Sequence, residues 1–183
     1  MIKELLDDAE LRMDQAVAHA QDEFTTVRTG RANPGILHRI TVEYYGTPTP
    51  LQQLASFSVP EPRLLVVSPY DKNSLVDIEK AIASGGLGLN PANDGNVIRL
   101  AFPQLTEDRR KELIKMVRHM AEEGRVAIRN VRRHTKDSLE SLHGEISDDD
   151  IRRAEKELQD ATDRHTARID ELLEHKEQEL LEV

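Results

Sequence analysis

Four arginines lie within ten residues in the segment RVAIRNVRRH, which runs from Arg125 to His134. The planar guanidinium group of arginine can hold two oxygens of one phosphate at once, so a dense group of arginines is typical of a surface that binds phosphate. The chain as a whole is acidic, with 25 Lys and Arg against 34 Asp and Glu and a formal net charge of -9 at pH 7. The chemistry of this segment therefore depends on where the positive charge is placed.

The positive charge is concentrated in one part of the chain. Residues 106–136 carry a net charge of +5, whereas residues 1–30 carry -4, residues 31–105 carry 0 and residues 137–183 carry -10. At about 100° per residue on a helix, six of these cations fall within an arc of roughly 60° and extend over about 38 Å. This basic stripe consists of Lys111, Arg118, Arg125, Arg129, Arg132 and Lys136.

The basic stripe has two interpretations, and both remain open from spacing alone. The stripe lies about 130° from the apolar seam of its helix. If it faces solvent, it indicates a surface that binds a nucleic-acid backbone. Alternatively, the cations pair with acidic residues such as Glu122 and Glu123, or with the acidic segment that follows, because charge runs usually form solvated faces. The overall negative charge argues against loose, nonspecific binding to nucleic acid.

Residue patterns for catalysis, cofactor binding and metal binding are absent from the sequence. There is no GxxxxGK[ST] pattern and no HExxH pattern, and GGLGLN lacks the spacing of a dinucleotide-binding loop. The seven histidines have no local ligand spacing, and there is no cysteine. We expect no catalytic residue, no metal and no cofactor of its own, so any energy that the protein uses must come from a partner.

Two kinds of segment must position the basic stripe. Apolar residues at alternating spacings of three and four predict long helices over about 2–28, from Thr106 to about 143, and from Ser147 onward. Between the first two helices, the pattern predicts a strand or an extended segment over 36–44, strands over 64–67 and 97–102, and a short helix over 71–83.

The three seamed helices must bury their apolar faces, most simply against one another. The sequence therefore predicts the α+β class: an antiparallel three-helix bundle from residues 1–30 and 105–183, with a small α/β module inserted at 31–104. The crossings TGRANPG and FPQLT are short, which suggests a hinge. The alternative is one long helical rod with a loose middle segment.

The composition and the apolar runs predict a soluble, cytoplasmic protein. The N-terminus MIKELLDDAELRMD has no apolar signal core, and no apolar run approaches the roughly 20 residues of a membrane span.

Several motifs occur in an order that resembles one known family. They are VRTGRANPG, YYGTPTPLQQLA, LTEDRRKEL, AIRNVRRH, SDDDIRRAEKELQDATDRH and LLEHKEQELLEV. With these motifs the chain resembles the bacterial-type ribosome recycling factors, and the resemblance extends over essentially the whole chain. Asn33 stands where that family more often has a small residue before Pro34, which is a minor departure.

The resemblance implies a two-armed, L-shaped molecule with an overall shape similar to transfer RNA. The implied function is to split the post-termination ribosome into subunits with elongation factor G and GTP, the GTP being used by that partner. It also implies that a basic helix face binds large-subunit rRNA. The implied rRNA-binding residues are Arg28, Arg31, Arg110, Arg125, Arg129, Arg132 and Arg133, and the implied hinge residues are Gly30, Arg31, Gln104, Leu105 and Thr106.

Two other functions stay open from the sequence. A helical scaffold or adaptor would use exposed apolar seams to bind protein partners and would self-associate, whereas the bundle interpretation predicts a monomer. A DNA-binding bundle would prefer duplex DNA to structured rRNA. Neither alternative involves a membrane.

Overall fold

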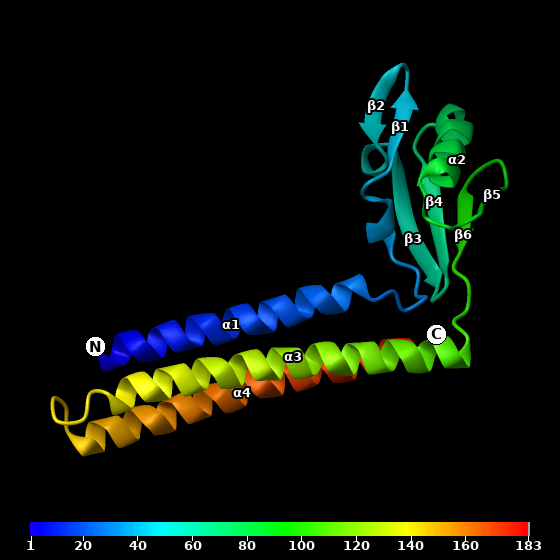
Figure 1. Ribbon diagram of the computed structural model, residues 1–183. Helices are drawn as coiled ribbons and strands as arrows, with labels where there is room; N and C mark the ends of the chain where they lie inside the picture. Colours follow the sequence, from blue (N-terminus) through cyan, green and yellow to red (C-terminus); the bar gives the residue numbers. More distant parts are fainter. Residues whose placement is uncertain (183) are drawn as a thin grey trace. The chain divides into compact units, whose positions relative to one another are not determined.

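The protein consists of two compact units, as a computed structural model that describes residues 1–182 shows. Residues 1–28 and 107–182 form a helical unit, and residues 29–106 form an α/β unit (Figure 1). The α/β unit is therefore an insertion in the sequence of the helical unit. The predicted α+β class, a helical bundle with an inserted sheet module, is confirmed.

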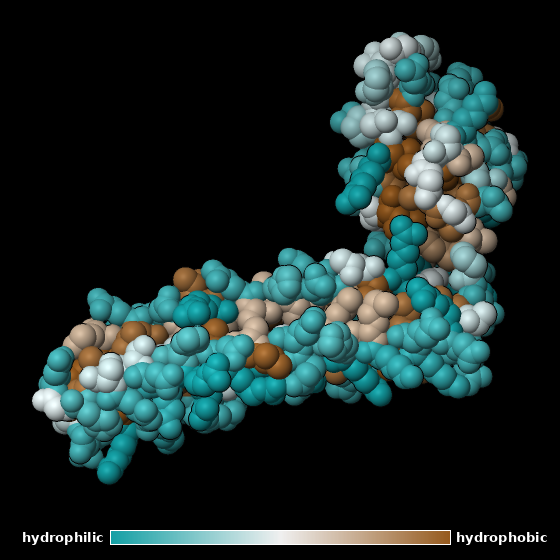
Figure 2. All heavy atoms as spheres, in the orientation of Figure 1, coloured by the Kyte–Doolittle hydropathy of each residue, from teal (hydrophilic) through white to brown (hydrophobic). Residues whose placement is uncertain are grey.

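Long amphipathic helices build the helical unit. They are α1 (Ile2–Thr26), α3 (Glu107–Glu140) and α4 (Asp148–Leu181). Each packs against the other two, and α3 runs antiparallel to both (Figure 1). The apolar seams face one another, while the visible outer surface is mostly hydrophilic (Figure 2). The fully buried side chains of this core include Met13, Val117, Ala121, Ile128, Leu139, Ile151 and Ile169.

The turn from α3 to α4 follows from local chemistry. Gly144 has a φ of 93°, which side-chain-bearing residues rarely adopt. The Ser147 hydroxyl then accepts a hydrogen bond from the Asp150 backbone N–H at 3.2 Å and caps α4, the helix that the sequence predicted from Ser147 onward. Three aspartates occupy the first turn, where the helix dipole favours negative charge.

Small residues allow the helices to approach closely near the middle of α3. Gly124 is buried, and a Cβ atom built on it would lie 2.8 Å from Ile169 Cδ1 on α4 and 3.3 Å from Ala20 Cβ on α1. A glycine costs helix propensity at an interior position, so its presence here is explained by this contact.

The α/β unit contains a hairpin and a separate antiparallel sheet. The hairpin pairs β1 (Thr41–Tyr44) with β2 (Thr47–Pro50), and the sheet has the order β3-β4-β6-β5. The sheet strands are β3 (Ala55–Glu61), β4 (Leu64–Pro69), β5 (Pro91–Asn93) and β6 (Ile98–Ala101).

One short α-helix covers much of the core of the α/β unit. It is the single α-helix among the described residues of this unit. This helix, α2 (Leu75–Ser84), buries Leu75, Ile78 and Ile82 at spacings of three and four, and it contacts β1 and β5. The side chains that complete the core come from both strand sets and the turns before them. They include Leu37, Val42, Leu51, Leu65, Val67, Ile98 and Leu100.

The strand predicted over 36–44 is wrong at its beginning. The chain forms a 3-10 turn at Pro34–Leu37, and strand β1 starts only at Thr41. The Asn33 side chain accepts a hydrogen bond from the Gly35 N–H at 2.9 Å, and Pro34 fixes the backbone of the first turn, so the local chemistry prevails over the apolar alternation.

Within the described part of the chain, no helix combines the length and apolar character that crossing a membrane requires.

Candidate nucleic-acid interface

The cations of α3 divide between two flanks of the helix. The buried residues of α3 form a broad arc, because the helix packs against both α1 and α4. One edge of the basic stripe lies directly beside α4, and the other edge is open to solvent. The predicted stripe is therefore exposed to solvent at Lys111, Arg118 and Arg129 and half-buried at Arg125, Arg132 and Lys136.

Three arginines spaced seven residues apart on α3 reach across to α4. Arg118 pairs with Glu177, and Arg125 donates to Asp170 at 2.8 Å from Nε and 2.6 Å from Nη2. Arg132 donates from Nε to Gln159 Oε1 at 2.7 Å, and Gln159 in turn donates to Asp163 at 2.9 Å. We call this set, Arg118, Arg125 and Arg132 with their α4 partners, the arginine ladder.

The arginine ladder holds α3 to α4. The Arg125 side chain is only 22% exposed, so its stem packs between the helices while its head remains hydrogen-bonded. Lys136 continues the contact, with its ammonium 3.9 Å from Glu155 on α4 and 3.4 Å from Glu140. Arg118, Arg125 and Lys136 are thus partly neutralised within the helical unit, as the alternative interpretation of the stripe described, whereas the partner of Arg132, Gln159, is uncharged.

Sequence reasoning missed the α4 side of the ladder, although a signal was present. Asp163, Asp170 and Glu177 also lie seven residues apart. Two antiparallel helices with equal repeats of opposite charge place those charges opposite each other at each repeat.

A second group of cations lies on the open side of α3. Arg129 and Arg133 are exposed, and Lys115 lies on the same side about four to five turns earlier. In residues 1–182, Arg133 and Lys115 make no ion pair, whereas Arg129 contacts Glu122 at 2.6 Å. We call Lys115, Arg129 and Arg133 the outer row.

Glu122 connects the two groups of cations. Its carboxylate accepts from Arg129 at 2.6 Å and from Arg125 at 3.1 Å. These hydrogen bonds, the one from Arg129 first, lower the pKa of Glu122 despite an opposing effect of burial. Glu122 therefore stays ionised and fixes the Arg129 side chain along the helix surface.

The remaining predicted site residues lie close in sequence to the points where the chain passes from one unit to the other. Arg28 is exposed just after α1, Arg31 is exposed in the α/β unit, and Arg110 is half-buried in the first turns of α3. Both Arg31 and Arg110 have interaction partners.

The predicted hinge residues lie in the segments that join the units in sequence. Gly30 has a φ of 75° and precedes Arg31, while Gln104, Leu105 and Thr106 precede α3. Inside the α/β unit, Ala32 N–H donates to Pro62 O at 2.7 Å and Phe102 N–H donates to Arg63 O at 2.8 Å. The same β3–β4 turn thus anchors the chain where it enters and where it leaves the α/β unit.

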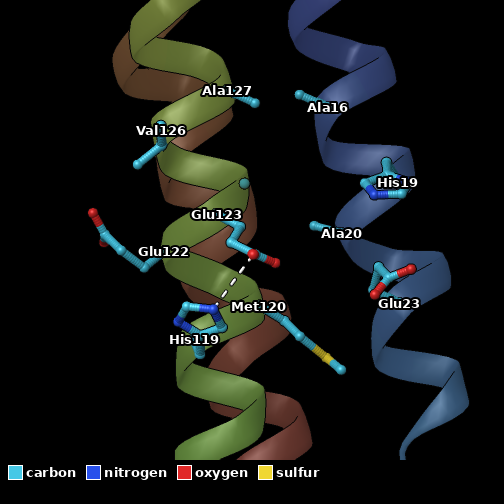
Figure 3. A pocket seen from close by; sticks show the side chains of 11 residues that line it. Ala16, His19, Ala20, Glu23, His119, Met120, Glu122, Glu123, Val126 and Ala127 are labelled. Carbon is cyan, nitrogen blue, oxygen red and sulfur yellow. Dashed lines mark ion pairs between the residues drawn. The ribbon is translucent and has the colours of Figure 1, made fainter.

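A shallow groove of about 490 Å³ runs between α1 and α3 (Figure 3). Ala16, Ala20 and Ala127 line its floor, and Glu23 and Glu123 point toward the space between the helices. Carboxylates at the rim repel phosphate, so this groove does not extend the basic surface.

Over residues 1–182, no group of His, Cys, Asp or Glu side chains is arranged to hold a metal ion. His165 is buried between helices, with Nε2 3.1 Å from Asp14 on α1 and Nδ1 2.6 Å from Ala161 O. This histidine links α4 to α1.

Comparison with known proteins shows to which family the chain is similar. A family model described as ribosome recycling factor matches residues 20–181. The chain belongs to the ribosome recycling factor family. The ribosome-recycling factor of Acidothermus cellulolyticus is 60% identical, and that of Streptomyces coelicolor is 55% identical, each over the full length of both chains.

Solved structures of ribosome recycling factors are similar to this chain over nearly its whole length. A solution structure has a TM-score of 0.76 and 42% identity, covering 100% of this chain and 98% of its own. A second describes the T. thermophilus ribosome recycling factor and the E. coli elongation factor G bound to the E. coli post-termination complex, with a TM-score of 0.64, 47% identity and 99% coverage of both chains. Ribosome recycling factors are translation factors rather than enzymes, and so is this chain.

Proposed function

We propose that this chain acts with elongation factor G and GTP to dissociate post-termination ribosomes into subunits in the cytoplasm. Its family supports this role, and one similar factor is described with elongation factor G on the post-termination complex. The chain carries no cofactor of its own in this proposal, and the partner GTPase hydrolyses the GTP.

The proposed contact with large-subunit rRNA rests on the outer row of α3. Arg133 and Lys115 present cationic groups that no acidic partner within the described residues neutralises, and Arg129 lies between them. Each phosphate neutralised by such a group releases condensed counterions from the RNA, which favours binding at low salt. Arg28, Arg31 and Arg110 are proposed to extend this contact.

Arg125 and Arg132 belong to the proposed rRNA surface in a different way. Arg132 uses Nε for Gln159, and in residues 1–182 no hydrogen bond is seen from its two terminal nitrogens. The Gln159 contact therefore orients a guanidinium fork whose outer edge can hold phosphate. Arg125 has three hydrogen bonds to α4 and α3 carboxylates, so its proposed main role is to hold the helices in place beneath that surface.

The proposed mechanism is mechanical. The helical unit anchors on rRNA, and the segments around Gly30 and Gln104–Thr106 act as a hinge when the GTPase pushes the α/β unit. The adaptor alternative requires exposed apolar seams, whereas most of the seam residues of α1, α3 and α4 that the structure describes are buried against each other.

Ribosome splitting measured by light scattering tests the proposed function. Purified post-termination ribosomes, elongation factor G and GTP are mixed with the chain, and subunit formation lowers the scattered intensity. We expect the ribosomes to split only when the chain, elongation factor G and GTP are all present, and we expect a nonhydrolysable GTP analogue to abolish splitting. Unchanged scattering with every component present would contradict the proposed function.

A further inference from the structure

The third arginine of the ladder meets α4 differently from the other two. Each arginine of the ladder, with its partners on α4, forms one rung, and in the first two rungs the arginine pairs directly with a carboxylate. The seven-residue repeat that places those charges opposite each other also places Asp163 opposite Arg132. In residues 1–182, however, Arg132 has no ion pair, and its Nε donates to the uncharged Gln159 side chain at 2.7 Å. A neutral amide therefore stands where the repeat predicts a salt bridge.

The Gln159 side chain bridges the arginine and the carboxylate of this rung. Its Oε1 accepts from Arg132 Nε at 2.7 Å, and its Nε2 donates to Asp163 Oδ1 at 2.9 Å. A side-chain amide has one accepting end and one donating end, so the reversed orientation would place a donor against a donor and a carbonyl oxygen against the carboxylate. The two hydrogen bonds therefore fix the Gln159 amide in a single orientation.

The α4 residue that precedes the acidic residue by one turn differs between the rungs. Gln159, Thr166 and Leu173 lie four residues before the three acidic residues of α4, and all three are half-buried. The threonine side chain is short and the leucine side chain has no polar atom, so neither can hold an arginine away from the carboxylate that follows. The long amide side chain therefore distinguishes the third rung.

The interposed amide leaves most of the Arg132 guanidinium available. Arg125, in the second rung, uses Nε and both terminal nitrogens for hydrogen bonds to carboxylates. Arg132 uses Nε for a neutral partner, and its terminal nitrogens make no hydrogen bond within the described residues. A guanidinium that is held at Nε, not neutralised and open at its outer edge is suited to two oxygens of one phosphate.

We propose that Gln159 is a positioning residue for rRNA binding, which separates Arg132 from Asp163 and directs the guanidinium toward a phosphate. Asp163 acts through Gln159, because it fixes the orientation of the amide. The third rung then serves binding, whereas the first two rungs hold α3 to α4. The proposal rests on the proposed function, in which Arg132 belongs to the rRNA surface.

Gln159→Glu tests whether this side chain must be neutral, because it keeps the size of the side chain and places a carboxylate on Arg132. We expect the Kd for vacant ribosomes, measured by co-sedimentation at low salt, to rise about tenfold. The slope of log affinity against log salt should fall by about one, since one phosphate contact is lost. The melting temperature should change little, because the new ion pair offsets the repulsion between the new carboxylate and Asp163.

The matched control is Gln178→Glu, which makes the same chemical change at an exposed position of α4. It adds the same charge to the helix without placing it on Arg132, so the Kd and the salt slope should equal those of the unmodified chain. Equal losses of affinity in both variants would overturn the proposal, because added negative charge alone would then explain them.

Truncation of Gln159 gives an independent test. In Gln159→Ala the arginine can pair with Asp163 directly, so ribosome affinity should fall although no charge is added. Asp163→Asn in the same chain removes the neutralising carboxylate and should restore most of the affinity. A role of Gln159 in stability alone predicts a second loss instead of a recovery.

Arg132→Ala separates failure of this proposal from failure of the proposed function. We expect Arg132→Ala to weaken ribosome binding at least as much as Gln159→Glu. If it does while both Gln159 variants bind normally, the positioning proposal alone is overturned. Normal binding by Arg132→Ala would remove this arginine from the rRNA surface and the positioning proposal with it. No binding by the unmodified chain would overturn the proposed function itself.

Discussion

Arg125 and Arg133 lie eight residues apart on α3, and their surroundings give them different roles. Arg125 is 22% exposed and bonded to Asp170 and Glu122, whereas Arg133 is exposed on the outer row. We predict that Arg125→Ala lowers the free energy of unfolding by about 1–2 kcal/mol, because Asp170 and Glu122 each lose hydrogen bonds from Arg125 and the truncated side chain leaves a gap between the helices. Arg133→Ala should change it by less than about 0.5 kcal/mol.

Urea unfolding followed by circular dichroism measures both free energies. Equal losses of stability in the two variants would contradict the division of the α3 cations into a ladder and an outer row.

Asp94 gives a second prediction at this scale. The backbone N–H groups of Val97 and Asn96, followed by the Arg99 side chain, lower the pKa of Asp94 from 3.8 to about 2. The folded state binds this proton less readily than the unfolded state, so the contribution to stability is present above pH 3.8 and is lost as the pH falls toward 2. Asp94→Asn should remove this pH dependence. Carboxyl chemical shifts recorded across an acid titration check the pKa, and a midpoint near 3.8 would show that the turn does not hold Asp94 as described.

At the scale of the helices, Gly124 sets how closely α1, α3 and α4 pack. An added Cβ would meet Ile169 Cδ1 at 2.8 Å, and Ile169→Val removes that methyl group. We predict that Gly124→Val costs about 1–3 kcal/mol through overpacking. Gly124→Ala should be less costly in an Ile169→Val background than in the unmodified chain, because the obstructing atom is gone. A double-mutant cycle measures this coupling, and strictly additive free energies would contradict it.

The sequence predicted the long helices well because their apolar spacing persists over many turns. The residues found at the helix ends, Gly144 after α3 and Ser147 before α4, are of the types that commonly end and begin helices. The start of β1 did not, because Asn33 and Pro34 impose a turn that alternation of apolar residues does not reveal.

The side that each cation faces could be predicted only in part. A helical wheel places Arg118, Arg125 and Arg132 relative to the seam of α3, but it does not say on which side of that seam α4 packs. The position of α4 decides whether they meet solvent or carboxylates.

For the whole molecule, burial of the helical seams predicts a monomer. The apolar side chains that could have joined a second copy, such as Met13, Ile128 and Ile169, are fully buried within the helical unit. Static light scattering at micromolar concentration should give the mass of one chain, independent of concentration. A mass that rises with concentration would favour the adaptor interpretation instead.

The most direct test of the account compares ribosome affinity across salt concentrations for the unmodified chain, Arg133→Ala and Arg118→Ala. Co-sedimentation with vacant ribosomes and isolated large subunits supplies the affinities. The outer row predicts that Arg133→Ala weakens binding and lowers the slope of log affinity against log salt by about one, while Arg118→Ala, which removes a ladder contact to Glu177, leaves both unchanged. Equal affinities and slopes for Arg133→Ala and the unmodified chain would contradict the claim that the outer row docks on rRNA.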